Sequence, residues 1–436
     1  MIFVLLAAGF FFPDLGATPL GRGGTGAAGA GDLSALVMNP AGLAALDGLR
    51  FQGELSSSWQ PIDFARAGNC GARPCATVSN SSGAFLNTLS GVSLALRPGL
   101  VVALAVHGPP STGRENFPDP RDFPPGTSLT RAPQRYSLIS ENNLIVYPGV
   151  GAAWRALDWL DVGAVAQLRY FRARQAQTIY SIGGIGGELT DFDAVASADA
   201  TDAARLVFGF GVIARPLPGL SVGLSARPGA PVHAEGALDV QLPPFAAAAG
   251  ATVTGRSARI DLDLPPEARL GVAWARGPLA VELDLTWENW GVLRSIRVTP
   301  LDIVIHQGGS DTRVGPISVP RNWHAAFSGR LGGEYELYTW LKVRAGALYE
   351  SSAIPDETLQ VDFASLPRLA ATAGATARWR SLSFTAGFAH FFPQSRTVTT
   401  SQVTRIDPYP APAFTIGNGQ YDTSLDVLAL QLAASL

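Results

Sequence analysis

The connections between candidate β-strands alternate between short and long along the whole chain. The short connectors contain Gly, Pro or a charged residue and lie at 97–99, 156–159, 215–219, 276–278, 333–338 and 380–381. The long connectors are polar or proline-rich and lie at 61–83, 108–134, 176–203, 236–257, 299–321, 353–365 and 398–420. This one-sided distribution is typical of transmembrane β-barrels, whose turns are tight on one side of the membrane and long on the other.

The segments between the connectors predict fourteen strands. They are 50–60, 84–96, 100–107, 143–155, 160–175, 204–215, 220–235, 258–275, 279–298, 322–332, 339–352, 366–379, 382–397 and 421–436. An even number returns both termini to the same side of the membrane. The fold class is therefore an all-β, antiparallel, up-and-down transmembrane barrel.

Side-chain periodicity supports these strands. Residues 281–288 alternate Val, Leu, Leu and Trp with Glu, Asp, Thr and Glu, and 341–350 and 381–388 alternate in the same way. One face suits lipid, and closure of the sheet leaves no backbone group unpaired in the membrane. A soluble β-sandwich also alternates, but it rarely combines fourteen long strands with loops of one-sided length. Most Trp residues lie near strand ends, where an interfacial girdle is expected.

Composition excludes other classes. Only 15% of residues are charged and the mean hydropathy is +0.18, yet beyond the first dozen positions no run of 18 apolar residues predicts a membrane helix. The net charge of −3 comes without a basic stripe, so no nucleic-acid partner is expected.

The N-terminal residues divide into two parts. Residues 1–8 are apolar and resemble the core of a truncated secretory signal, although no Lys or Arg precedes them. Residues 9–48 are rich in Gly and Ala and too irregular for a membrane strand. We expect them to form a hatch that plugs the lumen of a barrel at 49–436, because fourteen strands enclose a wide interior. A disordered periplasmic extension is the alternative.

Several stretches together resemble the FadL/TodX family of outer-membrane transporters for long-chain fatty acids and hydrocarbons. They are GATPLGRGGTGAAGAGDLSALVMNPAGLAALDG from Gly16, LPPEARLGVAWARGPLAVELDLTWENW from Leu264, RLGGEYELYTWLKVRAGALYESSAIPDETL from Arg330 and the closing NGQYDTSLDVLALQL. The chain departs from the family pattern in its last residue, Leu436, and in long loops with few obvious capture residues.

The resemblance implies a route for the cargo. Extracellular loops capture a hydrophobic molecule, a lumen pocket binds it, and it leaves sideways into the outer leaflet beside a kinked third strand. In the family the hatch motif, here Asn39-Pro40-Ala41, sits by that kink. The third strand here ends at Gly108 and Pro109, residue types that interrupt a ladder, although the start of a loop explains them equally well.

Four residues are candidate ligand contacts. Arg172 lies in a segment that resembles the family's at the extracellular end of the fifth strand, and its guanidinium could anchor a carboxylate. Leu242 and Phe245 lie in an apolar part of the fourth long loop, where exposed apolar surface indicates capture. Phe192 could face them from a short amphipathic helix within 187–204.

Inward-facing charges are expected to neutralise one another in the lumen. The candidates are Glu282, Asp284, Glu288, Arg330, Lys342 and Arg344. A charge in a confined interior is costly unless it is paired, so a structural network is the plainer interpretation. An unpaired Arg that binds a fatty-acid carboxylate is the alternative.

The remaining motifs predict no chemistry. Cys70 and Cys75 lie in one loop and could form a local disulfide or remain free. The GRGGTG run at 21–26 lacks the strand and helix of a nucleotide site, and the five His residues lack metal-ligand spacing. We expect no catalytic residue, cofactor or metal.

The expected protein is a monomeric, non-enzymatic barrel of the bacterial outer membrane. Its expected partners are outer-membrane lipid and a hydrophobic cargo, foremost a long-chain fatty acid. Uptake of aromatic or alkane hydrocarbons, an open diffusion porin and a surface-binding barrel are the alternatives.

Overall fold

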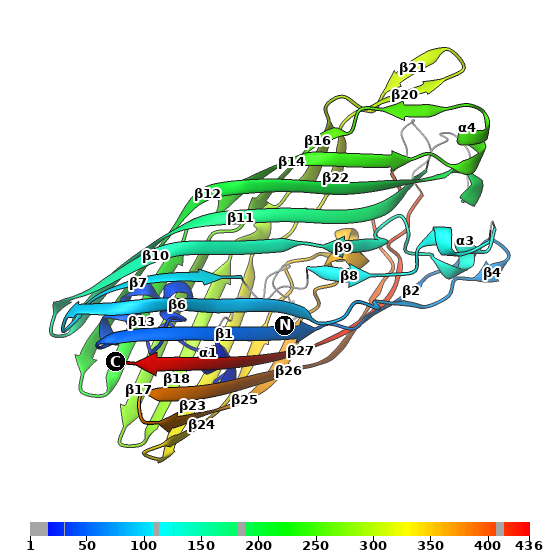
Figure 1. The fold of residues 1–436 in the computed structure, drawn as a ribbon. Coiled ribbons are helices and arrows are strands. Elements are labelled where there is room, and N and C mark those ends of the chain that lie inside the picture. Colours follow the sequence, from blue (N-terminus) through cyan, green and yellow to red (C-terminus); the bar gives the residue numbers. More distant parts are fainter. Residues whose placement is uncertain (1–15, 30, 109–112, 125, 181–187, 407–413) are drawn as a thin grey trace.

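Fourteen strands form one closed antiparallel barrel (Figure 1). The computed structural model describes residues 16–29, 31–108, 113–124, 126–180, 188–406 and 414–436. The barrel strands are β1 (Leu49–Trp59), β6 (Phe85–Arg97), β7 (Leu100–His107), β10 (Leu144–Leu157), β11 (Leu160–Tyr180), β12 (Asp193–Leu217), β13 (Leu220–Arg227), β17 (Glu267–Arg276), β18 (Leu279–Glu288), β23 (Ala326–Tyr338), β24 (Leu341–Glu350), β25 (Arg368–Trp379), β26 (Leu382–Val398) and β27 (Gly419–Ser435). The ring closes because β27 pairs with β1, which pairs in turn with β6.

Six two-residue turns join barrel strands at one end, the short-turn end. Five fall where the sequence predicted them, but the predicted connector at 333–338 is wrong because those residues belong to β23 and the turn is Thr339-Trp340. Gly332 and Gly333, which indicated a turn, lie inside the strand. At Gly332 an added Cβ would be 1.8 Å from the carbonyl oxygen of Arg22, so this glycine allows a close approach of backbone.

Three predicted continuous strands are each broken in two. The chain 220–235 breaks at Pro228-Gly229, 258–275 breaks at Pro265-Pro266, and 279–298 breaks between Glu288 and Ser295. Proline has no N–H for the ladder, so a break at the first two sites follows from the backbone chemistry. Beyond the breaks, β14 (Ala230–Gln241), β16 (Ser257–Leu264), β19 (Ser295–Pro300) and β22 (Ile317–Pro320) pair in that order and extend the wall toward the opposite, long-loop end.

The remaining elements are short. The strands are β2 (Ile62–Arg66), β3 (Asn69–Cys70), β4 (Arg73–Pro74), β5 (Val78–Ser79), β8 (Arg114–Asn116), β9 (Ser140–Asn142), β15 (Thr252–Thr254), β20 (Val304–Gln307) and β21 (Ser310–Arg313). The helices are α1 (Ala17–Gly21), α2 (Ala35–Met38), α3 (Ser128–Arg131), α4 (Pro244–Ala248) and the 3₁₀ turns η1 (Pro40–Ala45), η2 (Pro120–Asp122), η3 (Thr190–Phe192), η4 (Trp290–Val292), η5 (Asp356–Thr358) and η6 (Val361–Phe363). The amphipathic helix expected within 187–204 is reduced to the 3₁₀ turn η3, because β12 begins at Asp193. Among the described residues, no helix is long and apolar enough to cross a membrane.

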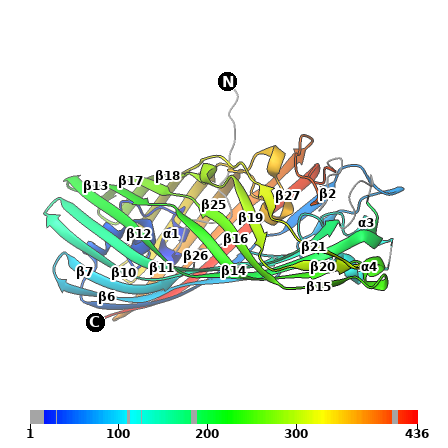
Figure 2. The same cartoon turned by 90° about the horizontal axis from the view of Figure 1, so that it is seen from above.

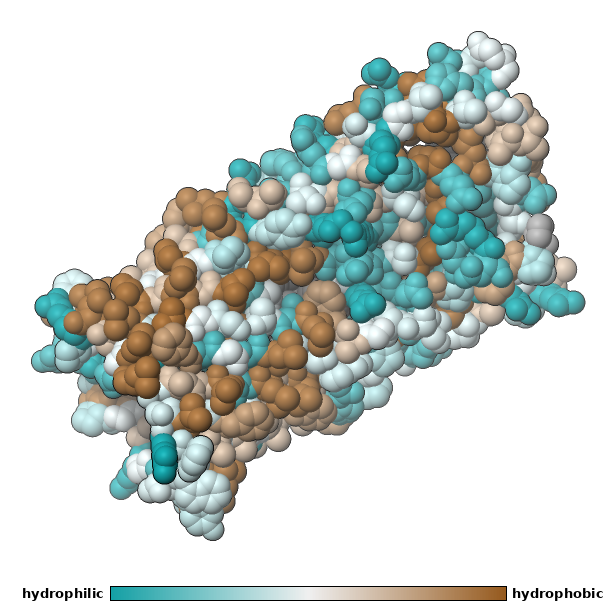
Figure 3. All heavy atoms as spheres, viewed as in Figure 1, coloured by the Kyte–Doolittle hydropathy of each residue, from teal (hydrophilic) through white to brown (hydrophobic). Residues whose placement is uncertain are grey.

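The outer wall is apolar toward the short-turn end. Brown side chains gather there in Figure 3, whereas the long-loop half of the same face is mostly polar. Exposed Leu, Phe and Val side chains of the barrel strands make this band, and exposed Trp residues flank it near the short turns, at Trp154, Trp159, Trp274, Trp340 and Trp379. The band is what a lipid-facing surface with an aromatic girdle requires. Trp290 and Trp323 instead lie in the core, with ring centroids 5.4 Å apart.

Residues 16–29 and 31–46, called the hatch below, lie inside the barrel (Figure 2). The hatch touches the wall at inward-facing glycines, where an added Cβ would fall within 3 Å of a hatch atom. These are Gly151, Gly163, Gly211, Gly223, Gly271, Gly332, Gly346, Gly374 and Gly387. They belong to nine different strands, so the wall holds the hatch around most of its circumference.

Candidate functional site

An apolar pocket lies in the long-loop half of the barrel. Its volume is about 1160 Å³ including its open mouth. Strands β11, β12, β14, β16, β19 and β22 supply its wall, and apolar side chains such as Phe171, Ile260 and Val298 dominate it. A largely apolar cavity with few polar groups is the usual form of a small-molecule site.

One cation lines the pocket among the described residues. Arg321 is almost fully buried and donates two hydrogen bonds to Asp362, one of them at 3.2 Å. The Arg321 guanidinium also lies 4.9 Å from the ring centroid of Phe363. Because Asp362 neutralises Arg321, the pocket presents no free cation to a carboxylate.

Two further buried acids lie beside that pair. Glu115 on β8 and Glu141 on β9 are direct cross-strand partners and are 2% and 4% exposed. Burial, the mutual repulsion of the two carboxylates and the charge of Asp362 raise the pKa of Glu115 well above 4.5. Burial is also the largest cause that raises the pKa of Glu141, to about 8. Both carboxyls are therefore largely protonated at neutral pH, and neither offers a positive charge to the polar end of the pocket.

Among the described residues, the pocket meets an interruption in strand pairing at the end of β7. The last β7 residue, His107, pairs with Leu89 on one side and with Tyr147 on the other. Beyond it, residues 85–88 of β6 and 144–146 of β10 have no β7 partner. Ile145 lines the pocket, and an added Cβ on Gly108 would lie 3.0 Å from its carbonyl oxygen. Pro109 lies outside the described residues.

The structure does not bring the hatch motif to this interruption. The Asn39 side chain donates to the carbonyl oxygens of Ala27 at 2.6 Å and Val212 at 3.1 Å, and Pro40 lies against Gly163. Ala41 N–H donates to the Asn39 side chain at 3.1 Å. Gly163 pairs with position 153 of β10, eight residues from Ile145 and about 26 Å along the strand. The motif therefore packs the hatch against β11 and β12.

Two of the three predicted capture residues, Phe192 and Phe245, meet at the long-loop end. The rings of Phe192 and Phe245 are 4.5 Å apart, and Phe192 also meets Tyr180 edge-on at 6.4 Å. Leu242 is half-buried just before α4. Tyr180 follows the pocket residue Ile179 on β11, so its side chain and this aromatic row lie on the opposite face of the strand from the pocket lining.

Arg172 does not reach the pocket. Its neighbours Phe171 and Ala173 line the cavity, so Arg172 points to the opposite face of β11. There it donates to Asp199 at 2.7 and 2.8 Å, with a third of its side chain exposed. The expected carboxylate anchor is wrong in position because strand parity outweighs the local motif.

The predicted lumen charges are paired, but mainly with other partners than expected. Glu282 accepts from Ala28 N–H at 2.7 Å and pairs with Arg22, and Asp284 accepts from the N–H groups of Gly26 and Ala27. These two acids therefore hold the hatch. The other contacts lie within the wall: Lys342 and Arg344 share Glu334, Arg330 pairs with Glu350 and bonds Thr286, and Glu288 lies beside Trp290.

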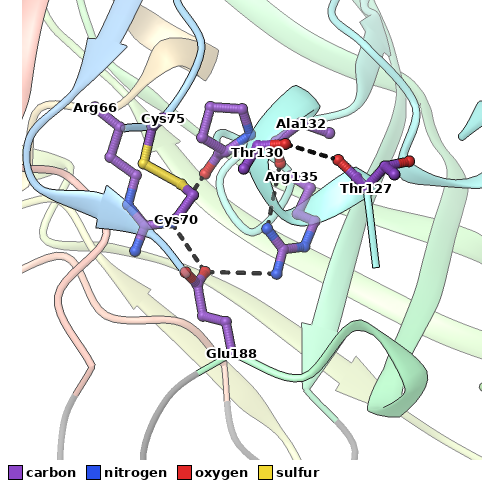
Figure 4. Close-up of a disulfide and its surroundings, with 9 residues drawn as sticks. Arg66, Cys70, Cys75, Thr127, Thr130, Ala132, Arg135 and Glu188 are labelled. Atoms are coloured by element: carbon purple, nitrogen blue, oxygen red, sulfur yellow. Dashed lines mark hydrogen bonds and ion pairs between the residues drawn. A yellow bond between two sulfur atoms is a disulfide. The ribbon is translucent and has the colours of Figure 1, made fainter. Parts of the chain in front are cut away.

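Charged residues and a disulfide tie the outer loops together (Figure 4). Cys70 and Cys75 are bonded to each other. Arg66 donates to Glu188 at 2.9 Å, and Arg135 lies 3.5 Å from Glu188 and 2.7 Å from Asp193. Burial raises the pKa of Asp193 although Arg135 opposes it. This network fixes the loops around the aromatic row.

These features define a membrane-spanning transport barrel with an internal plug and a hydrophobic pocket. Residues 145–435 match the family model described as outer membrane protein transport protein (OMPP1/FadL/TodX), and the chain belongs to this family. It is a bacterial outer-membrane transport protein of a family of hydrophobic-molecule transporters and not an enzyme.

Solved structures share the fold. A Pseudomonas aeruginosa FadL homologue is 16% identical with a TM-score of 0.80, covering 98% of this chain and 100% of its own. The Ralstonia pickettii toluene transporter TbuX is 14% identical with a TM-score of 0.67, covering 97% and 99%. The P. putida toluene transporter TodX is 13% identical with a TM-score of 0.67, also covering 97% and 99%. A sequence search of curated proteins finds no match.

Proposed function

We propose that this protein carries small hydrophobic molecules passively from its outer loops, through the apolar pocket, to the lipid beside the end of β7. Phe192, Leu242 and Phe245 make the first contacts at the loop end. The observation that carries the route is that Ile145 belongs both to the pocket wall and to the part of β10 without a β7 partner. A single barrel contains every step, so a monomer suffices.

Gly108 provides a test of the exit. In Gly108→Leu, the new side chain must displace the Asn87 side chain, 2.9 Å from its Cβ, or the backbone at Ile145. We expect uptake of cargo by proteoliposomes to fall at least tenfold while the barrel folds normally. Gly83→Leu is the matched control, because nothing lies within 4 Å of a Cβ at Gly83. Undiminished uptake by Gly108→Leu would refute an exit there.

The cargo class follows from the charges at the pocket. Arg321 is held by Asp362, and Glu115 and Glu141, whose raised pKa values keep them largely protonated at neutral pH, supply no positive charge, so an ionised carboxylate would find no free cation. We therefore favour an uncharged cargo of the hydrocarbon class. The solved relatives that are named toluene transporters are consistent with this choice.

A long-chain fatty acid is the second candidate, favoured by the presence of Arg321 in the wall. The Asp362→Asn variant separates the two. For a hydrocarbon cargo, toluene affinity should change little in this variant, whereas oleate should bind weakly to the wild type and more tightly to the variant. Tight oleate binding by the wild type that Arg321→Gln abolishes would establish the fatty acid instead. Mass spectrometry of co-purified ligand is the direct check.

A further inference from the structure

A second cavity, polar and separate from the apolar pocket, opens at the short-turn end between the hatch and the wall. Its volume is about 1170 Å³ including its mouth. The hatch contributes Thr18, Arg22 and Asp32, and the wall is formed by the ends of β24, β25, β26, β27 and β1. We call it the basic vestibule, for the six cationic side chains that line it: Arg22, Arg50, Lys342, Arg344, Arg378 and Arg380.

Cations outnumber carboxylates in this lining. Asp32 and Glu334 are the only acids among its described lining residues. Glu334 is shared by Lys342 at 2.8 Å and Arg344 at 2.7 Å. Within the part of the chain that the structure describes, no carboxylate pairs with Arg50, Arg378 or Arg380. Like charges confined between low-dielectric walls attract counter-ions strongly.

Two buried donors in this lining have no partner among the described residues, as do two buried acceptors, Asp32 Oδ2 and Gln431 Oε1. Gln52 is 6% exposed, its Oε1 accepts from Leu33 N–H at 3.0 Å, and its Nε2 has no partner among the described residues. Ser93, which is 1% exposed, has an Oγ without a partner in the same lining. A buried donor left without a partner is costly, so a bound acceptor would relieve it. An oxyanion supplies several acceptors.

We propose that the basic vestibule binds a small polyvalent oxyanion of the polycarboxylate or phosphate type from the periplasmic side. Guanidinium groups are suited to both ligands, because their planar donors match carboxylate and phosphate oxygens. The ligand would bridge hatch and wall, since Arg22 of the hatch, which also lies 3.3 Å from Glu282, lines the same cavity as Arg50 and Arg378 of the wall. Binding would therefore hold the hatch more firmly against the barrel wall.

The test is calorimetric titration of the full chain in detergent with citrate and, separately, with pyrophosphate. We expect saturable binding of at least one at a single site, weakening as sodium chloride is added. The double variant Arg50→Gln/Arg378→Gln should weaken it at least tenfold. Arg276→Gln is the control, an exposed arginine at another short turn outside the vestibule. If citrate binds more tightly, the natural ligand is a polycarboxylate; if pyrophosphate binds more tightly, it is a phosphate.

Hydrogen exchange provides an independent readout. The bound anion should slow amide exchange in the hatch at 17–22 and 33–38, and the double variant should lose that protection. No saturable binding of either anion, or equal binding by the wild type and the double variant, would overturn the proposal. Binding without hatch protection would overturn the bridging geometry.

Discussion

The guanidinium of Arg169 on β11 donates a hydrogen bond of 2.7 Å to the carbonyl oxygen of Pro231 on β14. Strand β12 lies between these two strands and pairs with β14 up to Thr201 and with β13 from Phe210 onward. Residues 202–209 of β12 have no partner on that side. The side chain of Arg169 therefore connects β11 to β14 where the backbone hydrogen bonds of β12 with β13 and β14 stop.

Arg169 should be among the most important residues for barrel stability. It is fully buried and also donates to Ala230 O at 3.2 Å and to Asp202 at 2.6 Å. Arg169→Met leaves a carboxylate and two carbonyl groups without their donor, a loss of about 3 kcal/mol or more. The free energy of unfolding, measured by urea titration in lipid vesicles, checks this.

Arg172→Met is the matched control for that experiment. Arg172 lies on the same strand and also pairs with an aspartate, Asp199, but on the exposed face. Its removal should leave the free energy of unfolding within measurement error, because water replaces a surface partner. Equal losses in both variants would show that the wall break does not depend on Arg169.

Gly211 should control whether the lumen is sealed. An added Cβ would lie 1.9 Å from Asn39 Oδ1, so Gly211→Ala must displace the hatch motif from β12. We expect ion conductance in planar bilayers to rise from near zero to discrete open events. Gly53→Ala on β1, where nothing lies within 4 Å, should stay closed.

The conductance of the wild type bears on the alternatives as well. A large steady conductance would favour an open diffusion porin, and an unchanged closed state in Gly211→Ala would mean that the hatch does not depend on this contact. The hatch contacts at the other inward-facing wall glycines would then keep the lumen closed.

The barrel could be predicted because its signals are local. Turn residues and period-two alternation depend on neighbours along the chain, and five of the six short turns follow from them. Gly332-Gly333 led to the wrong prediction of a turn. Glycine also occurs inside strands where another segment packs closely, and here the hatch backbone at Arg22 packs against Gly332. Pro228 and Pro265 could have revealed the breaks, since proline within a long strand argues against its continuity.

The site was less accessible to sequence reasoning. Glu115, Glu141, Arg321 and Asp362 come from four distant segments and meet only through strand pairing and the packing of η6. No motif marks them. Arg172 lies in a recognisable motif, but its position along β11 places its side chain on the outer face. Alternation along the strand decides which side chains reach the lumen.

The Glu115 and Glu141 pair should make the loop that carries β8 and β9 sensitive to pH. Burial is the largest cause that raises both pKa values, and Arg321, Asp362 and the Asn143 side chain are the groups that face the pair. An acid with a raised pKa in the folded state binds more protons there than when unfolded. The stability it contributes is complete below pH 4.5 and is lost as the pH rises through about 8.

Hydrogen exchange at 114–116 and 140–142 measures this dependence between pH 5 and 8.5, after correction for the intrinsic rate. Protection should fall as the pH rises in the wild type and should change much less in Glu115→Gln, which keeps the shape and removes one carboxylate. Glu235→Gln, at an exposed position of β14, should retain the wild-type slope. An unaltered slope in Glu115→Gln would mean that the pair does not titrate in this range.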